Sequence, residues 1–544
     1  MAPLKTLFTS SGYSTLLHRT RFALLIPTLS LIFGLLGGCG ANARQSTGGG
    51  GAAGVSGTAG HSGSMPDHGG AGSSGEAGSG GEGGTSDGGE GGASEGGNGG
   101  EGGASEDGKL SLTFDDAFVI KAQLRSDGSL LVLLDKPLDM RVDWGSPQRE
   151  LLLLSESGQP LASLASSTAS RFLLDFAAHD SGDVSVLYSS ADEYSLERFD
   201  VHGQSLGASI LSDPLIDQDP PVWNGSPSAA VEPLTRDAGR IAAFGEQLVV
   251  ATRTGRHSVI AQRFGFFNAG SVPAFHAEWR TLVVPPYGIT AVGLYGGSYD
   301  TFDAVHAQVM LHLAVDQAGT IYVGVQHPRV GDLNLIKAHA KVFGETLVGD
   351  ADALDLYVTR IASGGTRIGT TVVGTPEDDQ LFGLRGGQDS ALVIGRKEYW
   401  NDDGTGFDAL IARLEGKSGA LEVRELHVKR SDLAFDAVAL EDGSWLVAGA
   451  SDWQQNPSGA SVSEESQAFV QHLSAAGEGS TIALENGARH NEGRTLVDLG
   501  AGRFLIGGMT DGPGTHSGDA EPSHVRASGF LREVRVHGID SSAR

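Results

Sequence analysis

Short, mostly apolar runs follow glycine-bearing turns seven times after residue 109. Each run is five residues long, as expected of a strand that is buried on both faces of a sheet. The turns recur at intervals of 54 to 74 residues and therefore mark a repeated unit. The marker glycines are Gly128, Gly182, Gly245, Gly319, Gly387, Gly443 and Gly502, and the runs that follow them are LLVLL, VSVLY, QLVVA, IYVGV, ALVIG, WLVAG and FLIGG.

Most units also contain a more amphipathic strand that leads through a turn into a further strand. Examples are ELLLLSESGQPL from Glu150 and FDALIARLEGKSGAL from Phe407. Almost no stretch after residue 109 has a sustained helical period. We therefore predict an all-β domain over residues 109–544, and a β-propeller of about seven blades explains it best. A β-solenoid and a pair of stacked smaller β-domains are the alternatives.

The two ends of the predicted domain suggest how a propeller would close. The first strand, LSLTFDDAFVIKAQL from Leu110, is expected to pair with the last blade, which would remove the open sheet edges. Residues 271–316 fit the repeat poorly, so the pattern leaves the blade boundaries in this stretch open. The units resemble the β-propeller repeats of secreted bacterial proteins, as in Asp316–Gly324 and Phe407–Leu414.

The N-terminus has the pattern of an export signal. Residues Phe22–Leu36 are almost wholly apolar and are preceded by arginines, but they are shorter than the roughly 20 residues of a spanning helix. Directly after them, Leu36-Gly37-Gly38-Cys39 resembles the lipobox of bacterial lipoproteins. That resemblance implies that residues 1–38 are a signal peptide removed before Cys39, and that Cys39 carries a diacylglycerol anchor. An ordinary signal peptide with a chance cysteine is the alternative.

Residues 39–108 are predicted to be a disordered linker behind the lipidated cysteine. They are rich in glycine, serine, alanine and acid, with only Val55 and Met65 as sizeable apolar side chains. Such a segment cannot bury enough surface to fold, and its low complexity resembles the linkers of myxobacterial-type lipoproteins. Gly40 follows the cysteine in place of aspartate, which favours the outer membrane or cell surface over the inner membrane.

Charge and cysteine content narrow the choice of partners. The formal net charge is −28, and a field of that sign repels nucleic acid and anionic headgroups. Contact with the membrane is therefore expected through the lipid anchor alone. Acidity is also an ordinary solubility device. The single cysteine leaves the domain without disulfides or thiolate metal sites.

An aromatic and acidic segment in the longest interval of the repeat is a candidate ligand site. It contains Trp279, Tyr295, Tyr299, Asp300 and Asp303. Aromatic rings beside carboxylates can stack on a sugar or peptide and act on it. The alternative is that these aromatics only pack locally.

Two further groups were considered as metal ligands. The loop from Asn401 to Asp408 brings Asp402, Asp403 and Asp408 together with two glycines, which would suit Ca²⁺, although an acidic turn is the alternative. No other cofactor is indicated. His306 and His312 are about 20 Å apart on an extended strand and cannot share an ion. We expect their face to be solvated, opposite Leu311.

These observations favour a non-catalytic binding or scaffold module that meets a protein or glycan partner. The alternative is a propeller-type hydrolase or lyase acting on an extracellular glycan or peptide, and a third possibility is a structural surface protein. The usual contiguous enzyme motifs are absent from residues 109–544. Propeller active sites assemble from several blades, so the question of catalysis stays open.

Overall fold

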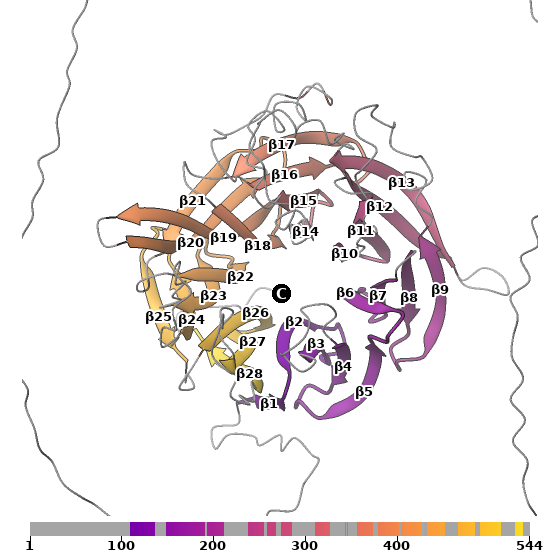
Figure 1. The fold of residues 1–544 in the computed structure, drawn as a ribbon, viewed down its shortest axis with the longest axis horizontal. Helices are drawn as coiled ribbons and strands as arrows, with labels where there is room; N and C mark the ends of the chain where they lie inside the picture. Colours follow the sequence, from indigo (N-terminus) through magenta and orange to yellow (C-terminus); the bar gives the residue numbers. More distant parts are fainter. Residues whose placement is uncertain are drawn as a thin grey trace, which may run out of the picture. The chain divides into compact units, whose positions relative to one another are not determined.

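The structure is a computed structural model in which seven four-stranded antiparallel sheets are arranged around a common axis (Figure 1). All described residues belong to the unit Ser94–Arg544. Residues 1–38, predicted to be a signal peptide, Cys39 and the predicted linker to residue 108 lie outside the described residues. The structure describes residues 109–136, 148–190, 193–211, 238–254, 258–267, 274–284, 310–326, 343, 345, 356–373, 379–401, 404–426, 428, 432–451, 466–484, 490–512 and 528–536.

Each sheet is one blade, numbered in chain order. Blade 1 consists of β2 (Phe118–Leu124), β3 (Leu130–Lys136), β4 (Gln148–Leu154) and β5 (Pro160–Ser166), and blade 2 of β6 (Phe172–Ala178), β7 (Val184–Ser189), β8 (Tyr194–Phe199) and β9 (Ser205–Leu211). Blade 3 consists of β10 (Gly239–Phe244), β11 (Gln247–Thr254), β12 (Ser258–Phe267) and β13 (Ala274–Val284), and blade 4 of β14 (Met310–Val315), β15 (Ile321–Gln326), β16 (Leu356–Ile361) and β17 (Arg367–Val373). Blade 5 consists of β18 (Asp379–Gly386), β19 (Ser390–Asn401), β20 (Gly404–Glu415) and β21 (Leu421–Leu426), and blade 6 of β22 (Leu433–Ala439), β23 (Trp445–Ser451), β24 (Gln467–Leu473) and β25 (Gly479–Ala483). Blade 7 consists of β26 (His490–Gly500), β27 (Arg503–Gly512), β28 (Ser528–Arg535) and β1 (Ser111–Asp115).

The seven-bladed propeller predicted from the repeat is confirmed. Every marker glycine lies in the turn between the first and second strand of a blade, and each apolar run is the second strand. All of these glycines except Gly387 have a positive φ, between 58° and 84°, which a glycine adopts without the steric cost that a side chain would add. The poorly fitting stretch contains a blade boundary, because β13 ends at Val284 and β14 begins at Met310.

The ring closes by combining the two ends of the domain, as expected. Residues 110–124 divide at Asp116, a non-glycine residue with φ 53°. The part before it, β1, pairs with β28 as the outermost strand of blade 7, and the part after it, β2, is the innermost strand of blade 1. One continuous segment thus belongs to both the last and the first blade.

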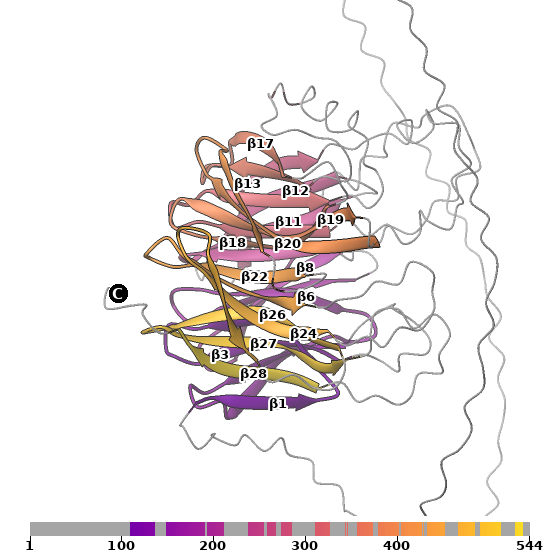
Figure 2. The ribbon, with the colours of Figure 1, turned by 90° about the vertical axis from the view of Figure 1, so that its left-hand side faces the viewer.

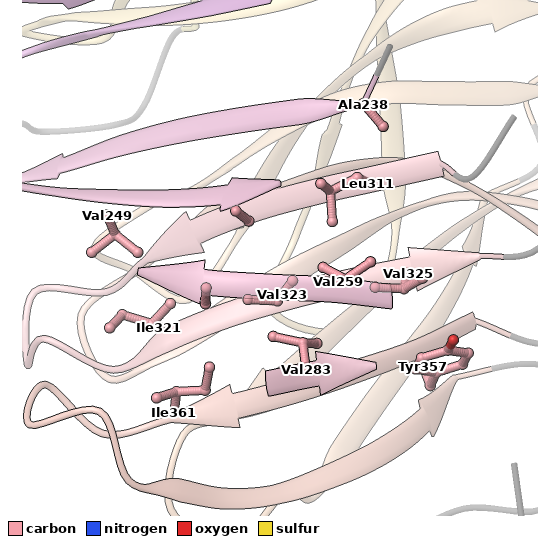
Figure 3. Packing of buried hydrophobic residues seen from close by; sticks show 12 residues of the cluster. Ala238, Val249, Val259, Val283, Leu311, Ile321, Val323, Val325, Tyr357 and Ile361 are labelled. Carbon is pink, nitrogen blue, oxygen red and sulfur yellow. The ribbon is translucent and has the colours of Figure 1, made fainter. Parts of the chain in front are cut away.

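The core is divided among the interfaces between blades. Within the described residues there are seven buried apolar clusters, one at each interface. Figure 3 shows the cluster between blades 3 and 4, where Val249 and Val259 face Ile321 and Val323. Because a radial sheet has a neighbour on each face, the second strands are apolar throughout rather than alternating.

The two faces of the ring differ in the connections they carry. We call the turn face the one that carries the turns between first and second strands and between third and fourth strands (Figure 2, left-hand side). We call the connection face the opposite one, where the first strands begin and where chain segments pass between second and third strands and from blade to blade.

Arginine side chains join neighbouring blades at the turn face. Each donates from its guanidinium group to a main-chain carbonyl in the turn between the third and fourth strands of the next blade. Such charge-assisted bonds are stronger than neutral ones and satisfy buried carbonyls. The bonds run from Arg125 to Val201 (3.3 Å), Arg263 to Ser363 (2.6 Å), Arg360 to Gly416 (2.9 Å) and Arg424 to Ser474 (3.0 Å).

Candidate functional site: the inner ring of polar residues

One position of the inner strands repeats around the axis. In each blade it is the residue of the first strand that pairs with the fourth residue of the apolar run on the second strand. In blade 3 this run is counted from Leu248. We call the seven residues at this position the inner ring. Six of the seven are polar, although inner strands are otherwise largely apolar. The inner ring consists of Lys121, Asp175, Arg240, His312, Gly383, Asp436 and Thr495.

Three inner-ring side chains make the same bond to the next blade. In each case an oxygen accepts the main-chain N–H of the residue that follows the next inner-ring position. Asp175 accepts from Ile241 (3.0 Å), Asp436 from Leu496 (2.7 Å) and Thr495 from Ala122 (3.2 Å). A carboxylate that accepts such bonds satisfies a buried donor and joins two blades.

Lys121 extends this linkage across blades 1 to 3. Its ammonium lies 2.7 Å from a carboxylate oxygen of Asp175 and donates to the carbonyl oxygen of Phe176 at 2.7 Å. Asp175 therefore contacts the lysine of blade 1 with one oxygen and the main chain of blade 3 with the other. Both groups are committed to the frame of the propeller.

Asp436 is held in a similar way between blades 5 and 7. Burial raises the pKa of its carboxyl, while Arg385 at 3.6 Å and the N–H groups of Leu496 and Ala437 act in the opposite direction. The bonds to main-chain donors use both oxygens, one each. Asp436 is thus a structural acceptor between blades.

His312 does not lie on a solvated face, and that expectation was wrong. Leu311 is buried in the core as expected, but His312 is half-buried and hydrogen-bonds the main chain of Leu381 in the next blade. The reason is that both faces of a radial blade are covered by neighbours. Burial, together with the positive charge of Arg240, lowers the pKa of His312 to about 3.

We expect His312 to make folding less favourable as the pH falls. Between pH 6.5 and about 3 the unfolded chain binds a proton at this position and the folded chain does not, so the free energy of unfolding decreases in this window. The slope from this group approaches about 1.4 kcal/mol per pH unit. Urea unfolding from pH 7 to 4.5 should show a shallower pH dependence for His312→Asn than for the wild type. An identical dependence would contradict the assignment.

The inner ring was missed in the sequence, although a signal for it exists. In five of the seven blades the residue stands seven positions before the marker glycine, as in Lys121 and Gly128 or Asp436 and Gly443. Aligning the inner strands on these glycines would have revealed a polar column in an apolar strand.

Trp279 is the one residue of the aromatic candidate site that the structure describes. It lies on β13, and its indole N–H donates to the carbonyl oxygen of Ser363 in blade 4 at 2.9 Å. The ring also packs on Gly365, where an added Cβ would approach it to 2.7 Å. Through these contacts the indole of Trp279 joins blade 3 to blade 4. Its role in ligand binding stays a prediction.

The remaining members of the two predicted sites lie outside the described residues, except Asp408. Tyr295, Tyr299, Asp300 and Asp303 belong to the segment between Val284 and Met310, and Asp402 and Asp403 to the one between Asn401 and Gly404. Both pairs of flanking strand ends lie at the connection face. Topology therefore starts and ends both segments on the same side of the ring.

Asp408 is a buried residue of β20 opposite Lys397 on β19. Over the residues that the structure describes, no group of three or more histidine, cysteine or acidic side chains is placed to hold a metal ion. Calcium binding by Asp402, Asp403 and Asp408 stays a prediction. In the same part of the chain, no helix has the length and apolar character needed to cross a membrane.

Two serine–histidine pairs were also not foreseen. His179 lies 2.8 Å from the hydroxyl of Ser185, and His472 lies 2.9 Å from that of Ser444. Both serines are at most 1% exposed, and Ser444 also bonds the Asp442 carboxylate within its turn. A catalytic nucleophile must reach its substrate, and these two hydroxyl groups are buried. Their hydrogen bonds therefore stabilise the turns between strands.

Comparison with known proteins adds solved structures of low similarity. No protein-family model matches the chain, and no curated protein matches its sequence. A protein of unknown function from Dyadobacter fermentans is 10% identical, with 77% of this chain and 95% of that one covered and a TM-score of 0.36. YCF48 bound to D1 peptide is 10% identical, with coverages of 79% and 96% and a TM-score of 0.39. The propeller domain of the Trilobed protease from Pyrococcus furiosus is 8% identical, with coverages of 79% and 98% and a TM-score of 0.37. None of these likenesses bears on function.

Proposed function

We propose that this propeller is a non-catalytic binding module, held at the outer membrane or cell surface by a lipid on Cys39. It meets a protein or glycan partner through the connection face. The observation that carries the proposal is the use of the inner ring. The acidic and imidazole members of the inner ring are Asp175, Asp436 and His312, and each is bonded to the main chain of the next blade.

A catalytic acid or base needs a proton that exchanges with substrate near the working pH. The Asp175 and Asp436 oxygens instead accept main-chain N–H groups. His312 is neutral at physiological pH because its pKa is about 3. These groups support a rigid frame that presents a surface, which is what a binding module requires.

The connection face is the proposed binding surface because the connecting segments that differ in length from blade to blade begin and end there. The starts of the first and third strands and the ends of the second and fourth strands all lie at this face. Function in rigid scaffolds is concentrated in connecting segments. The turn face, by contrast, is built from short turns tied to one another by arginine and main-chain bonds.

A photoreactive side chain at one of two matched serines tests the proposal. Ser170 is exposed in the connection from β5 to β6 at the connection face, and Ser157 is exposed in the turn from β4 to β5 at the turn face. On irradiation of cells that carry the full chain, we expect a discrete adduct from position 170 and none from position 157. Mass spectrometry identifies the adduct. Equal adducts from both positions, or from 157 alone, would overturn the choice of face.

A further inference from the structure

Arg240 differs from the other polar members of the inner ring. Lys121, Asp175, His312, Asp436 and Thr495 each bond to the next blade. Among the described residues, Arg240 makes a single hydrogen bond, from its guanidinium group to the carbonyl oxygen of the adjacent Gly239 at 2.9 Å. Within the described residues, no carboxylate pairs with Arg240. It is half-buried, so solvent reaches part of the side chain.

The fold itself does not require an arginine at this position. The equivalent residue of blade 5 is Gly383, which has no side chain to bond the next blade. The bond that joins blades 2 and 3 is made by Asp175 to the N–H of Ile241, and it does not involve the Arg240 side chain. A cation therefore stands at an inner-ring position where it contributes no described bond between blades.

A second guanidinium group lies close enough to Arg240 to feel its charge. Arg149 is the second residue of β4 and Arg240 is the second residue of β10, and both strands start at the connection face. Burial, with the repulsion from Arg240, lowers the pKa of Arg149, and Asp135 and Asp175 act in the opposite direction. Arg149 is itself held by a bond to the carbonyl oxygen of Leu174 at 2.9 Å and by Asp135 at 3.5 Å. Arg149 thus has Asp135 as its ion partner, whereas no described carboxylate pairs with Arg240. An anion bound by Arg240 would relieve the repulsion between the two guanidinium groups.

We infer that Arg240, with the charge of Arg149 nearby, binds a carboxylate of an acidic peptide segment at the connection-face end of the axis. This inference deepens the proposed binding function and rests on it. A guanidinium presents parallel N–H donors that match the two oxygens of a carboxylate. A singly charged carboxylate suits the site better than a phosphate dianion, because Asp135 and Asp175 lie near enough to repel a higher charge.

The test uses the purified full chain and a dipeptide of two glutamates with both ends blocked. Salt of about 0.15 M screens the acidic remainder of the protein beyond a Debye length of about 8 Å. We expect the Nε–H resonance of Arg240 to shift on titration, and Arg240→Gln to weaken binding at least about tenfold, because a charge-assisted pair is lost. Arg240→Lys keeps the positive charge but lacks the paired N–H donors of the guanidinium group, so its affinity for the dipeptide should lie between those of the wild type and Arg240→Gln.

The matched control is Arg413→Gln, which makes the same change of charge on an exposed side chain paired with Asp389 near the turn face. It should bind the dipeptide as the wild type does. Equal weakening by both substitutions, or no shift of the Arg240 resonance, would overturn the inference, and tighter binding of inorganic phosphate would overturn the carboxylate assignment. Thermal unfolding of each variant checks that it is folded.

The two failures can be told apart. If the photoreactive side chain at Ser170 captures a partner but the dipeptide does not perturb Arg240, only the carboxylate site is wrong. If the dipeptide binds through Arg240 but neither serine position yields an adduct, the proposed partner interaction at the connection face is wrong.

Discussion

Replacing Cys39 with serine is expected to abolish the incorporation of radioactive palmitate into this protein and to release it from membranes. Cys39 is the only cysteine of the chain, so no second thiol can take over its acylation. Acyl chains bind a bilayer with about 0.8 kcal/mol per buried CH₂, and several chains together give stable anchoring. Without them, the acidic remainder of the chain has no electrostatic attraction to anionic lipid.

Fractionation and labelling of the producing bacterium measure this directly. Ser46→Ala, in the adjoining linker, is the control and should retain the label. Undiminished labelling of Cys39→Ser would show that the protein has no lipid on this residue and that Phe22–Leu36 serves another purpose.

Leu112→Asp is expected to destabilise the whole propeller, by about 3–5 kcal/mol. Leu112 is 7% exposed on β1 and pairs with Leu531 of β28. It belongs to the apolar cluster between blades 7 and 1, together with Leu154 and Leu505. A carboxylate there would be buried without a partner, and the strand that completes blade 7 would lose its apolar contact.

Thr113→Asp is the matched control, because it places the same charge on the next residue of the same strand, where the side chain is exposed. Its effect should stay within about 1 kcal/mol, the range of strand propensities. Urea unfolding of the purified chains compares the two variants. Equal losses would mean that charge on β1, rather than burial of Leu112, controls stability. Two small losses would mean that the ring does not depend on its closing strand.

The repeat was readable in the sequence because its determinants are local. Turns such as Asp442-Gly443-Ser444 need a glycine with positive φ, and the strand that follows must be apolar on both faces. Both requirements leave marks within a few residues of each other. The count of about seven blades followed from these local features, and the closing strand was predicted from the additional strand that starts at Leu110.

The hydrogen bonds of the inner ring could not be predicted in the same way, because the residues that they join are far apart along the chain. Ala122 donates to Thr495 across 373 positions, and Ile241 donates to Asp175 across 66. A single aspartate or threonine in an apolar strand resembles an isolated exception until the blades are placed beside each other. The expectation that His312 faces solvent was wrong for the same reason. His312 bonds to Leu381 of the neighbouring blade, which is distant in the sequence.

The sequence by itself determined the all-β class, the seven-fold repeat and the closing of the ring, because backbone conformation at glycine and burial of the second strands are local demands. Only the tertiary structure decided what the polar residues of the inner strands do. Their hydrogen bonds, charges and pKa values depend on neighbours from other blades, and burial between sheets is a property of the ring rather than of any one strand.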